Sequence, residues 1–177
     1  MTVSSDGSGT PQIDLIRATR ADQPRLANLL ELYVHDFSEI LGLTPDNDGR
    51  FGYPLAPYFS DAGRFPFLIR TDSRLAGFAL VASGSQVTGD ASVFDVAEFF
   101  VVRGFRRHHV GQAAALRLFA SFAGTWEVRV IEQNVGALVF WERAVSAFTR
   151  RRHESFMFRS DRGRTFRVYR FVSPGPT

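Results

Sequence analysis

One stretch of the chain decides the fold: VFDVAEFFVV at residues 93–102, followed by RGFRRHHVGQAAALRLF at residues 103–119. The first part is the most strand-like run of the sequence, and it ends at Gly104. The second part is an arginine-rich turn that opens into a helix of small residues, from about Val110 to Phe122. A helix start offers unpaired backbone N–H groups and the positive end of the helix dipole. The stretch therefore predicts an anion site between a strand and a helix.

The residue types in the turn favour the same interpretation. Gly111 would let a phosphate approach the backbone closely, and Arg106 and Arg107 would add charge-assisted hydrogen bonds from the rim. In the alternative interpretation, the glycine only starts a helix and the arginines are solvated. The residues expected around the anion are Arg106, Arg107, His108, His109, Val110, Gly111, Gln112 and Ala113.

Along the rest of the chain, the spacing of hydrophobic residues switches between two residues, which is typical of a strand, and 3.6 residues, which is typical of a helix. The resulting order is β-α-loop-β-β-β-α-β-α-β-β. Strands are expected at residues 13–19, 64–70, 75–82, 93–102, 126–131, 152–159 and 165–172, the second and third joined through residues 71–74. Helices are expected at residues 22–41, 110–122 and 135–148, with an ordered aromatic loop, and room for a short helix, at residues 42–63.

Length and composition fit one globular domain with a full core, because the chain has 177 residues, of which 45% are hydrophobic and 22% charged. We expect this domain at residues 13–173, between a flexible N-terminal tail at residues 1–12 and a C-terminal tail at residues 174–177. No stretch approaches the ~20 apolar residues of a membrane span, and the first residues do not resemble a signal peptide. The expected location is cytoplasmic, without a membrane partner.

Two absences exclude whole classes of chemistry. Without cysteine, the sequence has no disulfides, thiolate metal sites or cysteine nucleophiles, and since all 21 basic residues are arginine it has no Schiff-base lysine. The 4 histidines lack metal-ligand spacing, so no metal is expected. The net charge of +3 is modest and the arginines are scattered, which disfavours nucleic-acid binding.

The turn at residues 106–111 resembles motif A of the GNAT superfamily of N-acetyltransferases, where a Q/R-x-x-G-x-G/A turn wraps the pyrophosphate of coenzyme A. In this chain His109 stands in place of the first glycine of that pattern. A second match begins at Asn134, where residues 134–141 resemble the N-x-x-A-x-x-F-Y segment, with Trp141 in place of the tyrosine. The run RLAGFAL at residues 74–80 looks like the third strand of the family.

The resemblance covers roughly residues 13–172 and implies an α+β fold. The GNAT sheet is mixed, mostly antiparallel and of about seven strands, splayed between the fourth and fifth, with helices on both faces. The pantetheine of coenzyme A would then lie in the splay and pair with the backbone of Phe100, Val101 and Val102. Asn134 and Phe140 would touch the cofactor, and a backbone N–H near Val101 or Val102 would donate to the oxyanion.

The same resemblance implies an acetyl-CoA-dependent N-acyltransferase that moves an acetyl group to a small amine by direct attack in a ternary complex. Glu98 is the candidate general base, because it is a carboxylate within the hydrophobic strand. In the alternative interpretation it points to solvent or pairs with an arginine. Residues expected near the acceptor are Tyr33, His35, Asp36, Tyr53 and Tyr58. In the alternative interpretation, the aromatic residues only pack the loop.

Two departures from the family pattern keep other functions open. Trp141 donates a hydrogen bond but cannot supply a proton, so either a tyrosine acts as the acid or the thiolate leaves unaided. Together with His109, Trp141 leaves room for a non-catalytic acyl-CoA-binding or regulatory module. An arginine-rich nucleic-acid binder is the least supported alternative. Homodimers are common among the relatives, and the sequence does not decide the oligomeric state.

Overall fold

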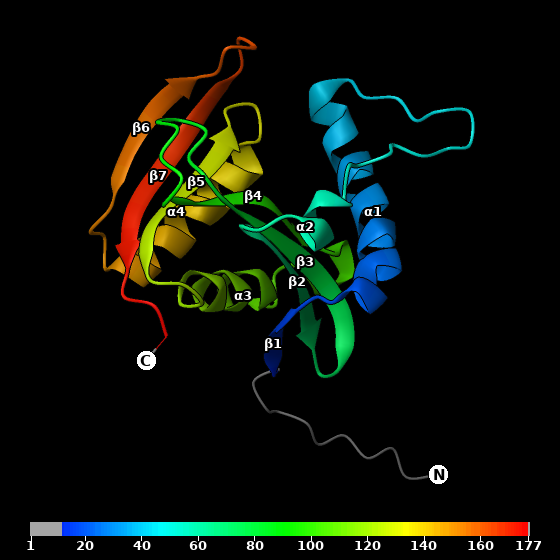
Figure 1. Ribbon diagram of the computed structural model, residues 1–177, viewed down its shortest axis with the longest axis horizontal. Helices are drawn as coiled ribbons and strands as arrows, with labels where there is room; N and C mark the ends of the chain where they lie inside the picture. The colour runs from blue at the N-terminus through cyan, green and yellow to red at the C-terminus, as the bar shows by residue number, and fades with distance from the viewer. Residues whose placement is uncertain (1–11, 177) are drawn as a thin grey trace.

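The computed structural model describes residues 12–176, so the N-terminal tail expected at residues 1–12 lies almost entirely outside the described part, as does Thr177. Seven strands form one sheet in the order β1-β2-β3-β4-β5-β7-β6 (Figure 1). The strands are β1 (Ile13–Arg17), β2 (Arg64–Thr71), β3 (Arg74–Ser83), β4 (Phe94–Val101), β5 (Gly124–Ile131), β6 (Glu154–Arg159) and β7 (Thr165–Ser173). Neighbouring strands are antiparallel except for β4 and β5, which confirms the mixed sheet.

Helices cover both faces of the sheet (Figure 1). They are α1 (Gln23–Leu41), α2 (Pro57–Ser60), α3 (Val110–Phe119) and α4 (Val135–Thr149), with short 3-10 turns at η1 (Arg20–Asp22) and η2 (Arg103–Phe105). The α2 helix is the short helix for which the aromatic loop left room. Among residues 12–176, no helix combines the length and the apolar character needed to cross a bilayer.

Separate hydrophobic clusters hold the two layers of helices. On one face, α3 and α4 bury Phe119 and Val145 against Trp126 of β5. On the other face, α1 buries Leu26 and Leu30 beneath the sheet residue Phe78. The sheet is therefore apolar on both sides, and polar side chains within it need partners.

The connection between β2 and β3 is shorter than expected. The sequence suggested that residues 71–74 form the loop, but only Asp72 and Ser73 lie outside the strands, with φ angles of 48° and 64°. Both values are left-handed, as in the two-residue hairpin turns whose twist matches that of the flanking strands. Because the turn needs only two residues, each strand is one residue longer than predicted.

The strands β4 and β5 part soon after they begin. Only Phe94, Asp95 and Val96 of β4 have partners in β5, which are Trp126, Glu127 and Val128. A bulge then follows in β4, because Val81 pairs with Val96 while Leu80 pairs with Glu98. Such a bulge adds a residue and bends the strand. The splay expected between the fourth and fifth strands is therefore confirmed, and it begins beyond Val96.

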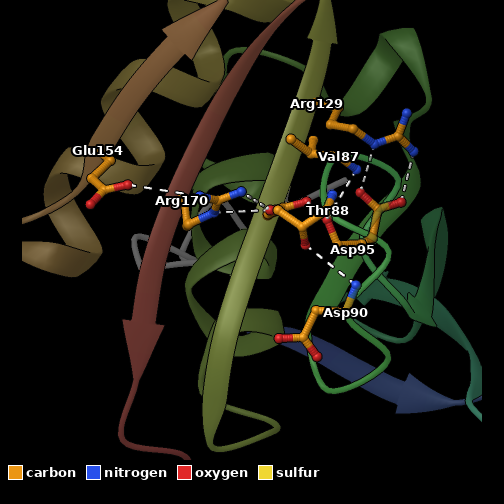
Figure 2. Close-up of polar contacts among 9 residues, drawn as sticks. Val87, Thr88, Asp90, Asp95, Arg129, Glu154 and Arg170 are labelled. Atoms are coloured by element: carbon orange, nitrogen blue, oxygen red, sulfur yellow. Dashed lines mark hydrogen bonds and ion pairs between the residues drawn. The ribbon is translucent and has the colours of Figure 1, made fainter. Parts of the chain in front are cut away.

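Ion pairs hold the strands together just before they part. Arg129 of β5 donates from Nε and Nη2 to the two carboxylate oxygens of Asp95 at 2.9 and 2.8 Å, as Figure 2 shows. The fully buried Glu127 accepts from Arg170 of β7 at 2.9 and 2.6 Å and from the Ser85 hydroxyl at 2.8 Å. Burial raises the pKa of Asp95, although the hydrogen bonds from Arg129 oppose the shift. Removing one partner of such a buried pair typically costs about 3–5 kcal/mol.

One glycine is required where β3 lies against the end of β4. A Cβ added at Gly77 would lie 2.0 Å from the backbone oxygen of Phe100, so the strands would have to separate. We predict that Gly77→Ala lowers the free energy of unfolding by about 1–3 kcal/mol in urea titrations. Gly104→Ala is the matched control, because no heavy atom lies within 4 Å of its added Cβ, and it should change stability by less than about 0.5 kcal/mol. Equal effects of the two substitutions would contradict this packing.

Candidate functional site

A cavity of about 820 Å³ opens where β4 and β5 part. That volume is in the range of pockets for substantial small ligands. Its walls are the end of β4, the turn that follows, the starts of α3 and α4, and one side of α1. The lining includes Tyr33, Asp36, Phe37, Ile40, Phe99, Phe100, Val101, Arg103, Arg106, Arg107, His109, Gly111, Gln112, Asn134, Ala137, Phe140, Trp141 and Arg143.

The turn into α3 presents a row of unpaired backbone donors. Within residues 12–176, no oxygen accepts a hydrogen bond from the backbone N–H of Val110, Gly111 or Gln112, and the first helical bond runs from Ala113 to the His109 carbonyl at 3.0 Å. Gly111 and Gln112 line the cavity. Unpaired N–H groups at the positive end of a helix dipole can bind an anion.

His109 takes the backbone conformation that a glycine would take at this position. Its φ angle is 60°, and that of Arg107 is 66°. Histidine is among the residues that enter this left-handed region most readily, so the turn keeps its shape despite the missing glycine. The His108 and His109 side chains are both exposed.

Gly111 has a packing role that the sequence did not reveal. Its φ angle is not left-handed, but an added Cβ would lie 3.2 Å from the Phe140 ring and 3.6 Å from Val101. The missing side chain thus lets α3 lie directly against α4 and β4. Close approach of the backbone is needed here for protein packing, whether or not a phosphate also comes near.

Arg106 does not extend to the rim, where we expected it. Its Nε donates to the Val101 carbonyl at 2.7 Å, and its Nη2 donates to Asp36 of α1 at 2.7 Å. Arg103 binds the same carboxylate from Nε and Nη2, at 3.1 and 2.8 Å to Oδ1. Burial alone would raise the pKa of Asp36, but hydrogen bonds from both arginines outweigh burial and lower it. Asp36 therefore ties α1 to the turn and is already neutralised.

The N–H and C=O groups of successive β4 residues point alternately toward β3 and away from it, and this corrects one expectation. The N–H of Val102 donates to the Ala76 carbonyl of β3 at 2.9 Å. Val102 is therefore wrong as a donor to an oxyanion or a pantetheine, since its N–H faces β3. Phe100, two residues earlier, also directs its backbone groups at β3, so it is wrong as a backbone partner of the pantetheine. In an antiparallel pair the outward groups belong to alternate residues, here Phe99 and Val101. Val101 keeps its N–H for a ligand, while its carbonyl is held by Arg106.

The start of α4 forms the wall opposite β4. The Asn134 side chain accepts from the Ala137 N–H at 3.0 Å and so caps the helix. Phe140 stacks on Phe99 with ring centroids 5.7 Å apart and planes 27° apart. Trp141 is only 7% exposed, and its ring packs against that of Phe99 with centroids 5.0 Å apart. Asn134 and Phe140 both line the cavity, as expected for residues that touch a cofactor.

Glu98 is held by tyrosines and not by an arginine. The hydroxyl of Tyr33 on α1 donates to Oε2 at 2.5 Å, and the hydroxyl of Tyr53 donates to Oε1 at 3.0 Å. Burial raises the pKa of Glu98, and the hydrogen bonds from the hydroxyls limit the rise. Burial and the nearby carboxylate also raise the pKa values of Tyr33 and Tyr53, so both remain protonated donors. Three candidates that are far apart in the sequence thus meet at one carboxylate.

The remaining acceptor candidates are Tyr58 and His35. Tyr58 belongs to α2 and is buried beside Tyr53, with the Arg64 guanidinium 5.3 Å from its ring centre. His35 is exposed and faces Phe51 at 6.4 Å, and neither His35 nor Tyr58 lines the cavity. Sequence reasoning did not select Phe37 and Ile40 as lining residues. Their spacing from Tyr33 on one side of α1 was the available signal.

In the described part of the chain, residues 12–176, no group of three or more His, Asp or Glu side chains could hold a metal ion. The site consists of backbone donors, arginines, aromatic rings and one carboxylate bound by two hydroxyls. Backbone donors and arginines of this kind can bind an anion, and a carboxylate such as that of Glu98 can accept a proton.

No family model and no curated protein matches the chain in sequence. Solved structures match it in fold, among them an acetyltransferase from Thermus thermophilus with a TM-score of 0.66 and 16% identity, over 92% of this chain and 98% of that one. An acetyltransferase of the GNAT family from Staphylococcus aureus has a TM-score of 0.57 and 11% identity, over 91% and 99% of the two chains. The spermidine N-acetyltransferase from Vibrio cholerae, in complex with CoA and spermine, has a TM-score of 0.59 and 11% identity, over 92% and 96%. The chain therefore has the fold of the GNAT acetyltransferase superfamily.

Proposed function

We propose that this protein is an acetyl-CoA-dependent N-acetyltransferase acting on a small amine. The observation that carries the proposal is the row of unpaired N–H groups at Val110, Gly111 and Gln112, which borders the cavity between the parted strands. A diphosphate is a strong acceptor for such donors. The fold supports coenzyme A as the diphosphate carrier, since one solved structure with this fold is a complex with CoA and spermine.

The rest of coenzyme A has matching surfaces along the cavity. The pyrophosphate would bind at residues 107–112, and Arg107 and Arg143 line the cavity with side chains exposed for further phosphate contacts. The pantetheine would lie along β4, with the outward N–H of Val101 available to it. Asn134 and Phe140 would contact it from α4. The thioester would then lie beside Tyr33 and Phe100, whose rings are neighbours in the cavity lining.

Glu98 is the proposed general base, and Tyr33 connects it to the cavity. A primary amine with a pKa near ~10 is ~99.9% protonated at pH 7, which adds about 4 kcal/mol to the barrier unless a base removes the proton. Glu98 does not itself line the cavity, but Tyr33 does, and its hydroxyl is already bonded to the carboxylate. The hydroxyl of Tyr33 would accept the amine proton while passing its own proton to Glu98, so the tyrosine stays neutral.

The charges favour an acceptor with one amine and an apolar body. Asp36 is the single acidic residue in the cavity lining, and two arginines neutralise it. Among the described residues, no other acidic residue lines the cavity, so a second cation on the acceptor would find no free carboxylate there. From α1, Phe37 and Ile40 supply apolar surface beside Tyr33. A monoamine that carries an aromatic or aliphatic group fits this lining better than a polyamine does.

The function is tested with the full chain, acetyl-CoA and a panel of amines. Acetyl-CoA should raise the melting temperature, because a ligand that binds only the folded state stabilises it. Thiol release should follow with phenethylamine as acceptor and be much slower with spermidine. Absence of any acetyl-CoA binding would overturn the proposal, and binding without turnover across the panel would favour the non-catalytic module. Faster turnover of spermidine would contradict the acceptor class alone.

Glu98→Gln tests the base while leaving the shape of the side chain. We predict that kcat/KM at pH 7 falls by about 100-fold, the lower end of the usual contribution of general base catalysis. The loss should shrink as the pH approaches the pKa of the amine, because free amine then forms without help. A pH-independent loss would indicate a structural role for Glu98 and would remove it from the mechanism.

Tyr33→Phe and Tyr53→Phe form a matched pair, since each deletes one hydroxyl from Glu98. A hydrogen bond to a carboxylate favours its charged form, so Tyr53→Phe should raise the Glu98 pKa and move the acidic limb of the kcat/KM profile to higher pH, with the plateau retained. Tyr33→Phe should instead lower the plateau, because it also breaks the path to the cavity. Identical profiles for the two variants would contradict a relay through Tyr33.

A further inference from the structure

A second cavity, of about 780 Å³, lies at the other end of β5 and β7. Thr125, at the start of β5, lines it, whereas Asn134, which lines the first cavity, follows the end of β5. Its lining includes Thr125, Phe148, Thr149, Arg150, Arg152, His153, Glu154, Arg170, Phe171, Val172 and Pro174. None of these residues lines the first cavity. The second cavity is therefore separate from the site of the proposed function.

β6 begins too late to cover the end of β7. The sequence predicts a strand from residue 152, but β6 starts at Glu154, and its pairing with β7 ends at Arg170. β7 continues through Ser173 and remains paired with β5 (Figure 1). The residues that follow α4 include Arg150 and Arg151, whose φ angles of 52° and 64° are left-handed values that strands do not adopt. The end of β7 thus has a neighbouring strand on one side only.

At this free edge, the backbone of Val172 points outward. The Thr165 carbonyl of β7 accepts from the N–H of Glu132, which follows β5, at 3.1 Å. On the β6 side, the carbonyl of Arg164 accepts from the Ser160 N–H at 2.9 Å. Because the backbone groups of successive strand residues alternate in direction, the even-numbered residues of β7 face the β6 side. Among residues 12–176, no backbone group pairs with the N–H or C=O of Val172 on that side.

The uncompensated charge in the second cavity is positive. Arg150 and Arg152 are exposed, and neither forms an ion pair with a residue in the described range 12–176. Arg170 differs, because its Nε and Nη2 donate to Glu127 at 2.9 and 2.6 Å. Its Nη1 lies 4.0 Å from the carboxylate of Glu154, as Figure 2 shows. Arg150 and Arg152 therefore remain available to carboxylates from outside.

Apolar side chains flank the free edge on both faces of the sheet. On the face covered by α4, the rings of Phe148 and Phe171 have centroids 5.8 Å apart. The side chain of Val172 belongs to the opposite face, because successive strand residues alternate, and it is 71% exposed. Arg150 directly follows α4, on the face of Phe171. An extended chain beside Val172 would thus meet a cationic group on one face and an apolar one on the other.

We infer that the second cavity binds an extended, acidic segment of a partner protein. The segment would exchange two backbone hydrogen bonds with Val172, as a short added strand. Its carboxylates would bind Arg150 and Arg152, and the apolar side chains that alternate with them would cover Val172. A nucleic acid would satisfy the arginines, but it has no peptide backbone with which to extend the sheet. The free edge together with the unpaired arginines therefore favours an acidic peptide.

The first test uses the unmodified, isotope-labelled full chain and a synthetic probe, the peptide acetyl-Glu-Val-Glu-Val-Glu-amide. At saturation the Val172 amide signal should move downfield and its hydrogen exchange should slow, because its N–H gains an acceptor. The Phe171 amide faces β5 and is the internal control. The same peptide with glutamine in place of glutamate should bind at least about fivefold more weakly at low salt, and the difference should shrink as salt is added. An unmoved Val172 signal, or equal affinity for both peptides, would overturn the inference.

The second test compares Arg152→Gln with Arg151→Gln. The two substitutions remove the same charge from neighbouring exposed residues, but only Arg152 lines the cavity. We expect Arg152→Gln to weaken binding of the glutamate peptide by about fivefold, as for loss of an exposed ion pair, and Arg151→Gln by less than about twofold. Equal losses would mean that the peptide responds only to overall charge, which would overturn the site. Acetyl-CoA binding should be the same in both variants, because neither residue lines the first cavity.

Other occupants of the edge would give different results. A single-stranded oligouridine that displaces the peptide and binds more tightly, without slowing exchange of the Val172 amide, would assign the arginines to a nucleic acid. Self-association in sedimentation experiments, with the Val172 amide already slow to exchange before peptide is added, would assign the edge to a second copy of the chain. Either result would overturn the inference and leave the proposed function unaffected, since acetyl transfer is measured at the first cavity.

Discussion

The parting of β4 from β5 is the constraint on which the rest of the site depends. A continuous sheet would fill the space with backbone hydrogen bonds, but here the parallel pairing ends after Val96 and Val128, and a bulge at the next residues bends β4 away. The bidentate pair of Asp95 and Arg129 fastens the two strands immediately before they separate. The opening is thus rigid at its base, and unpaired backbone groups of β4 face it.

Beside the opening, the two faces of β4 have different chemical surroundings. On the side of α1, Glu98 lies with two tyrosine hydroxyls, where burial raises its pKa and suits it to accept a proton. On the side of α3 and α4, apolar rings surround an indole donor. Arginines neutralise Asp36, Asp95 and Glu127, so Glu98 differs from these carboxylates in having no cationic partner among the described residues. The opening therefore has a buried carboxylate held by hydroxyls on one side and a layer of packed aromatic rings on the other.

Local patterns in the sequence were sufficient to predict the fold and the position of the turn that leads into α3. The order of strands and helices follows from hydrophobic period, and the turn at residues 106–111 follows from a strand that runs into a helix of small residues. The direction of long side chains could not be predicted, because it depends on partners distant in the chain. Arg106 was expected at a phosphate and instead binds Asp36, 70 residues away. Likewise, the exclusion of Val102 required the register of β3 against β4, and the meeting of Glu98 with Tyr33 required the packing of α1 on the sheet.

The central claim is that the backbone at the start of α3 binds the pyrophosphate of coenzyme A. The most direct measurement is a titration of the isotope-labelled full chain with coenzyme A, following the backbone amide signals of Val110, Gly111 and Gln112. These three proton signals should move downfield and saturate together, since each N–H gains a charged acceptor, while the amides of the distant turn at residues 160–163 stay in place. Saturation of the chain with coenzyme A without movement of these signals, or the absence of any saturable binding, would contradict the claim.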